Sequence, residues 1–183
     1  MTTTYVGLGS NLQQPTLQLD NAITALQQLP DCTLIQCSSY YGSKAIGPGQ
    51  QPDYVNAVAR LNTSLSAHHL LSQLQRIEHK QGRRRHTHWG PRTLDLDLLL
   101  YGTCVLQDSE LTLPHPRLKE RNFVVTPLFE IAPDLILPDG STLVTLLENT
   151  TRENLWQLDH KHSREQCNGT TSEPTDAAGD DMA

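Results

Sequence analysis

Apolar and polar residues alternate with two distinct periodicities along the chain, and these are the two rhythms of the sequence. A period of two, typical of strands with one apolar face, predicts strands at residues 3–8, 32–41, 54–63 and 94–101. Apolar residues three and four positions apart predict helices at residues 15–29, 67–81, 124–131 and 142–147. Shorter apolar runs predict strands at residues 104–106, 111–113 and 133–140. We therefore expect strands and helices to be mixed along the whole chain.

Two segments of twelve residues each, 42–53 and 82–93, show neither rhythm. The first is dense in glycine and proline, and the second carries four arginines and Trp89. Loops of this length without internal structure are uncommon in a compact domain and often act as lids. The sequence therefore predicts two long loops, the second of which starts where Gly82 ends the preceding helix.

The strand at residues 94–101 carries two acidic residues, Asp95 and Asp97, between leucines. Residues two apart in a strand point the same way, about 7 Å apart at ~3.3 Å of rise per residue. Two neighbouring carboxylates repel each other unless a cation lies between them, and hard oxygen ligands of this kind suit Mg²⁺. The alternative is an edge strand with a solvated polar face.

The basic residues Arg83, Arg84, Arg85 and Arg92 precede this strand closely. Guanidinium groups match phosphate with a two-pronged set of donors. Arginines next to a metal-binding pair of carboxylates therefore indicate a site for a nucleotide polyphosphate. The alternative is a solvated basic loop, although such loops seldom include a tryptophan such as Trp89.

Three other features point less strongly to function. Gly7 and Gly9 fit a phosphate-binding loop, but a tight turn after the first strand is the favoured interpretation. Tyr54 and Asn56 share a strand face that could hold a flat heterocycle, although spacing alone favours a surface tyrosine and a turn asparagine. His115, between two prolines, is a further candidate.

Composition limits the class of protein. The 183 residues carry a net charge of −6, which argues against a nucleic-acid backbone as the partner and favours a small anionic ligand at the local basic cluster. No apolar run is long enough for a transmembrane helix, and we expect no signal peptide. The four cysteines lack C-x-x-C spacing, so they are expected to be reduced thiols of a cytoplasmic protein.

The chain divides into two regions by composition. Residues 1–159 carry the rhythms described above and are expected to form a single catalytic domain. Residues 160–183 contain few large apolar side chains, so they cannot bury enough surface to offset their ordering entropy. We expect them to form a disordered polar C-terminal tail.

Several motifs together resemble one enzyme family. They are YVGLGSNL at 5–12, QPDYVNAVA at 51–59, WGPRTLDLDLLLYG at 89–102, LPHPR at 113–117, ERNFV at 120–124 and PLFEIAPDL at 127–135. The chain resembles the 6-hydroxymethyl-7,8-dihydropterin pyrophosphokinases, and the stretch from Gly90 to Asp97 is the family signature. Ser43 and Ala45 stand where many members have threonine and proline.

The resemblance implies a fold and an activity. The implied fold is α+β, a ferredoxin-like antiparallel sheet with helices, elaborated with extra strands and two long active-site loops. The implied enzyme is an ATP-dependent diphosphotransferase of folate biosynthesis. It moves diphosphate from ATP to the hydroxymethyl group of 6-hydroxymethyl-7,8-dihydropterin, and it releases AMP. The implied partners are these two small molecules and two Mg²⁺ ions. A monomer with neither nucleic acid nor membrane as a partner is expected.

The resemblance also assigns roles to residues. The implied catalytic residues are Arg83, Arg85, Arg92, Asp95, Asp97 and His115, with Asp95 and Asp97 as metal ligands. The implied ATP-binding residues are Gln75, Arg83, Arg85, Trp89, Arg92, Leu98, Thr112, His115 and Arg121. The implied pterin-binding residues are Ser43, Lys44, Ile46, Tyr54, Asn56, Trp89, Asp95 and Phe123.

Two other functions remain open from the residues alone. A Mg²⁺-dependent nucleotidyltransferase could use the same pair of aspartates, and it would release pyrophosphate rather than AMP. A ferredoxin-like RNA-binding module could use the arginines and aromatic residues, but the net charge of −6 and the paired aspartates argue against it.

Overall fold

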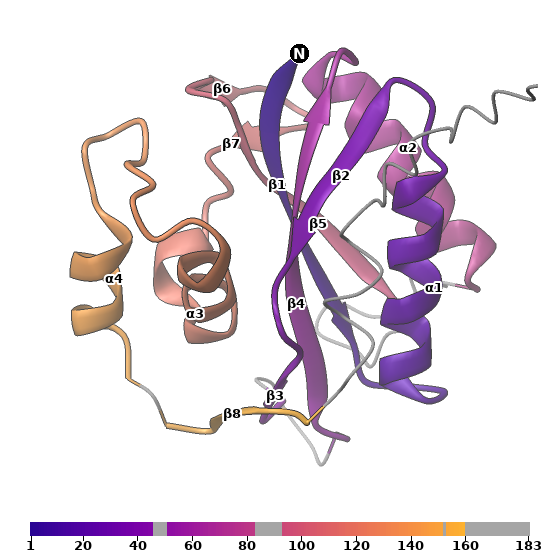
Figure 1. Ribbon diagram of the computed structural model, residues 1–183, viewed down its shortest axis with the longest axis vertical. Coiled ribbons are helices and arrows are strands. Elements are labelled where there is room, and N and C mark those ends of the chain that lie inside the picture. Colours follow the sequence, from indigo (N-terminus) through magenta and orange to yellow (C-terminus); the bar gives the residue numbers. More distant parts are fainter. Residues whose placement is uncertain (46–50, 83–92, 152, 160–183) are drawn as a thin grey trace, which may run out of the picture.

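The computed structural model describes residues 1–45, 51–82, 93–151 and 153–159. Its centre is an antiparallel sheet of six strands, with two helices on each side (Figure 1). The strands of the sheet are β1 (Thr2–Ser10), β2 (Cys32–Cys37), β3 (Tyr41–Ser43), β4 (Tyr54–Thr63), β5 (Asp95–Tyr101) and β8 (Leu155–Gln157). Strands β6 (Leu106–Gln107) and β7 (Thr112–Leu113) form a separate pair.

The helices are α1 (Pro15–Gln27), α2 (Ala67–Lys80), α3 (Asn122–Ile131) and α4 (Leu143–Asn149), with a short 3-10 helix η1 (Leu118–Glu120) before α3. Strands β1, β2, β4 and β5 with helices α1 and α2 follow the order β-α-β-β-α-β, and they lie side by side as β5-β1-β4-β2. This is the ferredoxin-like arrangement, so the expected α+β fold is confirmed. Among the described residues, no helix is long and apolar enough to cross a membrane.

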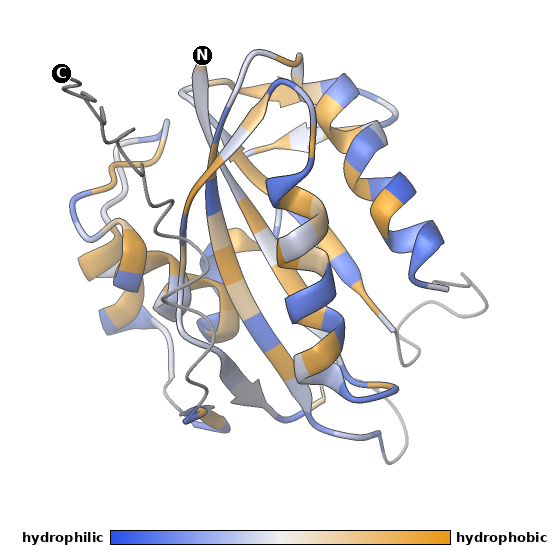
Figure 2. Cartoon of the chain, turned by 45° about the vertical axis from the view of Figure 1, so that its right-hand side comes forward, coloured by the Kyte–Doolittle hydropathy of each residue, from blue (hydrophilic) through white to orange (hydrophobic). Residues whose placement is uncertain are grey.

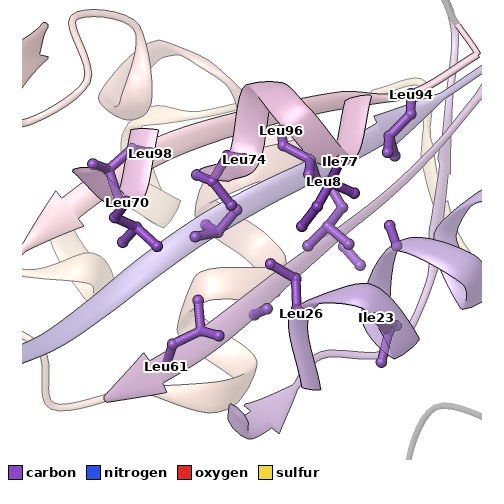
Figure 3. Packing of buried hydrophobic residues seen from close by; sticks show 14 of the residues in the cluster. Leu8, Ile23, Leu26, Leu61, Leu70, Leu74, Ile77, Leu94, Leu96 and Leu98 are labelled. Carbon is purple, nitrogen blue, oxygen red and sulfur yellow. The ribbon is translucent and has the colours of Figure 1, made fainter. Parts of the chain in front are cut away.

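The sheet separates two apolar clusters. On the face covered by α1 and α2, side chains of Leu8, Leu61 and Leu96 pack against Leu26 and Leu74 of the helices (Figure 3). Hydrophobic and hydrophilic residues alternate along both helices, as the rhythm of three and four predicts (Figure 2). The side chain of Ser66 accepts a hydrogen bond from the backbone N–H of His69, which caps the start of α2.

The second cluster lies on the opposite face, under α3 and α4. Val58 and Leu99 contribute from the sheet, and Val125 and Leu128 contribute from α3. Figure 1 shows these two helices on the left of the sheet, and α1 and α2 on the right. The second cluster covers only part of its face, and the remainder carries the polar residues of the candidate site.

Several boundaries differ from the sequence-based expectations. Gly7 and Gly9 lie inside β1, which runs through to Ser10, so neither a turn nor a phosphate-binding loop begins there. The strand expected at residues 32–41 ends at Cys37, and a separate strand, β3, extends into the predicted first loop. Residues 133–140 form turns with one isolated bridge, Ile136 to Thr142, rather than a strand.

Strand β8 was not expected. Its three residues pair with β3, and its tryptophan, Trp156, lies against Gly42 of that strand. The predicted tail, residues 160–183, lies outside the described residues, as do residues 46–50 and 83–92 of the two predicted loops.

Candidate active site

A cavity of about 280 Å³ opens on the second face of the sheet, next to the apolar cluster under α3. Its floor consists of β1, β4 and β5, and its walls come from β3, the start of β4, and the segment from η1 to the start of α3. The floor residues are Gly7, Leu8, Gly9, Asn56, Ala57, Asp95, Asp97 and Leu99. The wall residues are Ser43, Lys44, Tyr54, Arg117, Glu120, Arg121, Phe123 and Val124.

Strand pairing places the polar residues of the floor next to one another. Gly9 of β1 lies between Asn56 of β4 and Asp95 of β5, and Gly7 pairs with Asp97. Because directly paired residues point to the same face of a sheet, these five positions share the face that carries the cavity. Gly7 and Gly9 add no side chain to this face, and only Oδ1 of Asn56 lies within 4 Å of where a Cβ of Gly9 would be, so the floor is open there.

Positive charge from Arg121 offsets the repulsion between the two aspartates. The guanidinium nitrogen Nη1 of Arg121 lies 3.6 Å from Oδ2 of Asp97. Nε2 of the His115 ring lies 3.8 Å from the same oxygen. β5 is an edge strand of the described sheet, as the alternative interpretation held, but the face with the two aspartates lines the cavity.

The environment of His115 favours its neutral form. Burial, and then the nearby positive charge of Arg121, lower the pKa of His115 from 6.5 to about 4, with the carboxylate of Asp95 opposing this shift. The backbone N–H of Arg117 donates to Nδ1 of the ring at 3.2 Å. In a neutral imidazole the proton is then on Nε2, the nitrogen that faces Asp97. This nitrogen is therefore a hydrogen-bond donor directed toward the anionic end of the cavity.

Asn56 lies at the other end of the floor and is 5% exposed. Its amide nitrogen donates to the hydroxyl of Ser43 at 2.9 Å and to the carbonyl oxygen of Tyr41 at 3.2 Å. These bonds orient the side chain, and its Oδ1 lies on the side of Gly9. A buried amide held in this way presents a fixed acceptor to a ligand.

Two aromatic side chains, Tyr54 and Phe123, line the cavity from different walls. The guanidinium of Arg121 lies 5.6 Å from the centre of the Phe123 ring and also faces Asp97. Arg121 therefore connects the aromatic part of the cavity with its acidic part. The arrangement can hold a flat ring between the aromatic walls while an anionic group lies near the carboxylates and Arg121.

The wall formed by β3 is supported by the C-terminal strand. The ammonium group of Lys44 pairs with Asp53 at 2.9 Å and lies 5.6 Å from the centre of the Trp156 ring. The backbone N–H of Lys44 donates to the carbonyl oxygen of Asn154 at 3.2 Å. Lys44, a residue of the cavity wall, is thus held both by Asp53 at the far end of the first loop and by the segment that contains β8.

The structure brings together many of the predicted site residues. Eight of them line the cavity: Ser43, Lys44, Tyr54, Asn56, Asp95, Asp97, Arg121 and Phe123. Four others do not line it: Gln75 on α2, Leu98 on β5, Thr112 on β7, and His115, which follows β7 and faces Asp97. Their nucleotide contacts stay predictions. The remaining predicted residues lie outside the described residues: Ile46, Arg83, Arg85, Trp89 and Arg92.

Sequence reasoning missed three contributors. Gly7 and Gly9 are floor residues, and their period of two within the first strand was the available indication. Glu78 of α2 is 3% exposed and accepts a hydrogen bond from the backbone N–H of Leu96 at 2.7 Å. Glu78 therefore holds the segment of β5 from which Asp95 and Asp97 project. No local pattern distinguishes it from a solvated helix residue.

The donor set fits Mg²⁺ rather than a metal enclosed by protein ligands. Within the described part of the chain, no group of three or more histidine, cysteine, aspartate or glutamate side chains could hold a metal ion. Mg²⁺ usually binds one or two carboxylates and completes its shell with water and phosphate oxygens, and Asp95 and Asp97 offer that number on one strand face.

The fold and the site together define an α+β protein with paired carboxylates and an arginine beside an aromatic-walled cavity. Residues 5–133 match the model of the 7,8-dihydro-6-hydroxymethylpterin-pyrophosphokinase family, and the chain belongs to that family. The resemblance noted from the motifs is therefore confirmed.

Relatives with similar sequences are named as enzymes of this family. The chain is 49% identical over 158 residues to the 2-amino-4-hydroxy-6-hydroxymethyldihydropteridine pyrophosphokinase of Haemophilus influenzae. The aligned residues cover 86% of this chain and 99% of the relative. It is 47% identical over 154 residues to the enzyme of that name from Pseudomonas aeruginosa, and the aligned residues cover 84% of this chain and 95% of the relative.

Solved structures show the same fold. A Plasmodium falciparum HPPK-DHPS structure with pterin and p-hydroxybenzoate superposes with a TM-score of 0.71 and 11% identity over 89% of this chain. A second structure, of HPPK-DHPS in complex with substrates, gives a TM-score of 0.66 at 10% identity over 86% of this chain. This chain spans only 46% of each of those longer chains, so the likeness concerns the fold alone.

Proposed function

We propose that this protein transfers diphosphate from ATP to the hydroxymethyl group of 6-hydroxymethyl-7,8-dihydropterin, giving the pterin diphosphate and AMP, in folate biosynthesis. The observation that carries the proposal is one cavity in which Tyr54, Phe123 and Asn56 adjoin Asp95 and Asp97. Family membership and the names of the relatives support the same reaction.

The pterin is proposed to lie between Tyr54 and Phe123, since flat aromatic systems stack favourably on such rings. Asn56 would accept from a donor on the edge of the heterocycle through Oδ1, because its amide nitrogen is already engaged by Ser43 and Tyr41. In this pose the hydroxymethyl group points toward Asp95 and Asp97, the polar end of the floor.

The phosphates of ATP are proposed to lie at that polar end. Asp95 and Asp97 would hold Mg²⁺, two ions in our proposal, and the metal would supply charge neutralisation and orientation of the phosphate oxygens. Arg121 and His115 face Asp97 and can donate to phosphate oxygens. Arg83, Arg85 and Arg92 are proposed to add donors from the second loop, which lies largely outside the described residues.

The reaction requires positioning more than covalent participation of the protein. The hydroxymethyl oxygen forms a bond to the β-phosphorus of ATP, and the bond from that phosphorus to the oxygen bridging to the α-phosphate breaks. AMP leaves with the bridging oxygen, and the hydroxyl proton is lost to solvent. Closure of the two loops would exclude water that could otherwise accept the diphosphate. A monomeric cytoplasmic enzyme is part of the proposal.

Product analysis with labelled ATP tests the proposal. ATP labelled at the α-phosphorus and, separately, at the γ-phosphorus is incubated with Mg²⁺ and the dihydropterin. We expect the α label in AMP and the γ label in the pterin product. The α label in the pterin product, with release of pyrophosphate, would instead identify a nucleotidyltransferase.

A further inference from the structure

Gly9 occupies the centre of the cavity floor. It lies on the central strand β1, directly between Asn56 of β4 and Asp95 of β5. In the proposed function these neighbours have different tasks, since Asn56 recognises the edge of the pterin and Asp95 holds the metal. A side chain at Gly9 would project into the space that connects the two tasks.

The fold itself does not require a glycine at this position. The backbone of Gly9 is not in the left-handed region, and a Cβ added there would meet only Oδ1 of Asn56, at 3.6 Å, which is an ordinary contact. Glycine inside a strand is unfavourable because it loses more conformational freedom on folding than alanine. Neither backbone geometry nor packing therefore explains why β1 carries glycine here.

Gly7 provides a comparison on the same strand and the same face. A Cβ at Gly7 would contact the side chain of Leu99 at 3.4 to 3.6 Å, so an added methyl group would lie against the apolar cluster under α3. A Cβ at Gly9 has no such apolar neighbour and stands beside Oδ1 of Asn56, the acceptor proposed for the pterin. The same methyl group would thus extend packing at one position and cover a ligand acceptor at the other.

We propose that Gly9 is a specificity-determining residue: its missing side chain lets the edge of a flat heterocycle, held between Tyr54 and Phe123, approach the backbone of β1 between Asn56 and Asp95. This inference rests on the proposed function and adds a residue to it. It predicts that a side chain at Gly9 lowers affinity for the pterin and leaves affinity for the nucleotide unchanged. The nucleotide phosphates are proposed to lie at the other end of the floor, next to Asp97 and Arg121.

The test compares Gly9→Ala with Gly7→Ala in the full chain. Binding of 6-hydroxymethylpterin is measured by calorimetry with saturating Mg²⁺ and a non-hydrolysable ATP analogue, and binding of the analogue is measured separately. For Gly9→Ala we expect about tenfold weaker pterin binding or more, nucleotide binding within about twofold of the wild type, and an unchanged or raised Tm. For Gly7→Ala we expect a loss of no more than about threefold in pterin binding.

Three outcomes would overturn the inference. Wild-type pterin affinity in Gly9→Ala would show that the floor has room for a side chain. A Tm lowered by several degrees would show that the glycine serves the fold. Equal losses in the two variants would show general crowding of the cavity. In each case the wild type still binds pterin, so the proposed function stands, whereas a wild type that binds no pterin refutes both.

Discussion

On one face of β1, β4 and β5, the side chains of Val6, Ala59 and Leu96 pack in the apolar cluster beneath α1 and α2. On the other face, Gly9, Asn56 and Asp95 of the same three strands line the cavity. Each strand therefore contributes alternately to the core and to the site. The core side is closed by two helices, whereas α3 and α4 cover only part of the site side. Substitutions on the two faces of one strand should consequently separate stability from catalysis.

The largest effect is expected on the core face. Leu61 of β4 is fully buried between the sheet and the two helices, and Leu61→Ala removes three side-chain carbons there. We expect the free energy of unfolding to fall by about 2–5 kcal/mol. Turnover per folded molecule should stay within about twofold of the wild type, because Leu61 points away from the cavity. Urea unfolding and turnover at low temperature measure the two quantities.

Leu17→Ala is the matched control for Leu61→Ala, because Leu17 on α1 is 46% exposed. It should change the free energy of unfolding by less than about 0.5 kcal/mol. If Leu61→Ala lowered turnover per folded molecule by about 100-fold, as we expect below for Asp97→Asn, the two faces would not separate stability from catalysis.

Asp97→Asn should act in the opposite way. Removing one charge of the proposed metal pair should lower turnover by more than about 100-fold, equivalent to ~2.7 kcal/mol in the activation free energy. Stability without metal should hold, because the lost attraction to Arg121 is offset by relief of repulsion from Asp95. Turnover is measured at limiting and at saturating Mg²⁺, with Asp134→Asn, an exposed carboxylate outside the cavity, as the control. Unchanged turnover at limiting Mg²⁺ would remove Asp97 from the metal site.

The alternation of apolar and polar residues with a period of two predicted which strand residues face the core and which face the site. It set the bounds of β4 at 54–63 and placed Asp95 and Asp97 on one face, and helical spacing located α1 and α2 with few boundary errors. It failed where partners distant in sequence decide the structure. The glycines of β1 indicate a turn locally, but pairing with β4 and β5 on both sides keeps them in a strand.

Two other features have the same non-local origin. The three residues of β8 are too few to show a rhythm, and β8 exists because β3 offers an unpaired edge. The contact of Arg121 with Asp97 joins residues 24 positions apart, and no spacing in the sequence implied it.

A third prediction concerns pH and the site face. Since burial and Arg121 hold the pKa of His115 at about 4, the ring stays neutral in the folded protein at pH 5, whereas in the unfolded chain it takes up a proton below about pH 6.5. The stability this group contributes is therefore present above about pH 6.5 and is lost as pH falls toward 4. Relative to the wild type, His115→Gln should reduce the loss of stability between pH 7 and pH 5 by on the order of 1 kcal/mol.

Unfolding of the metal-free protein at the two pH values measures this difference. His69→Gln is the control, because His69 is an exposed residue of α2. Equal pH dependence in His115→Gln and the wild type would show that the ring is protonated in the folded protein at pH 5.

The smallest effect is expected at the wall of the cavity. Trp156 of β8 lies so close to Gly42 that a Cβ there would be 2.3 Å from its ring, and Lys44 lies over the same ring. Trp156→Ala should loosen β3 and raise KM for the pterin by about three- to tenfold, with KM for ATP unchanged. Trp156→Phe should retain most of the contact and most of the affinity. Steady-state kinetics with each substrate varied in turn separates the two KM values.

Truncation after Asp159 is the control for Trp156→Ala, because it removes residues 160–183 and leaves β8 and the hydrogen bond from Leu158 to the carbonyl oxygen of Tyr40 intact. The polar composition of the removed segment predicts no measurable change in Tm or in either KM. A truncated chain that behaved like Trp156→Ala would mean that residues 160–183, rather than the tryptophan, support the wall. A wild-type pterin KM in Trp156→Ala would mean that pairing of β3 with β4 is sufficient to hold Ser43 and Lys44 in place.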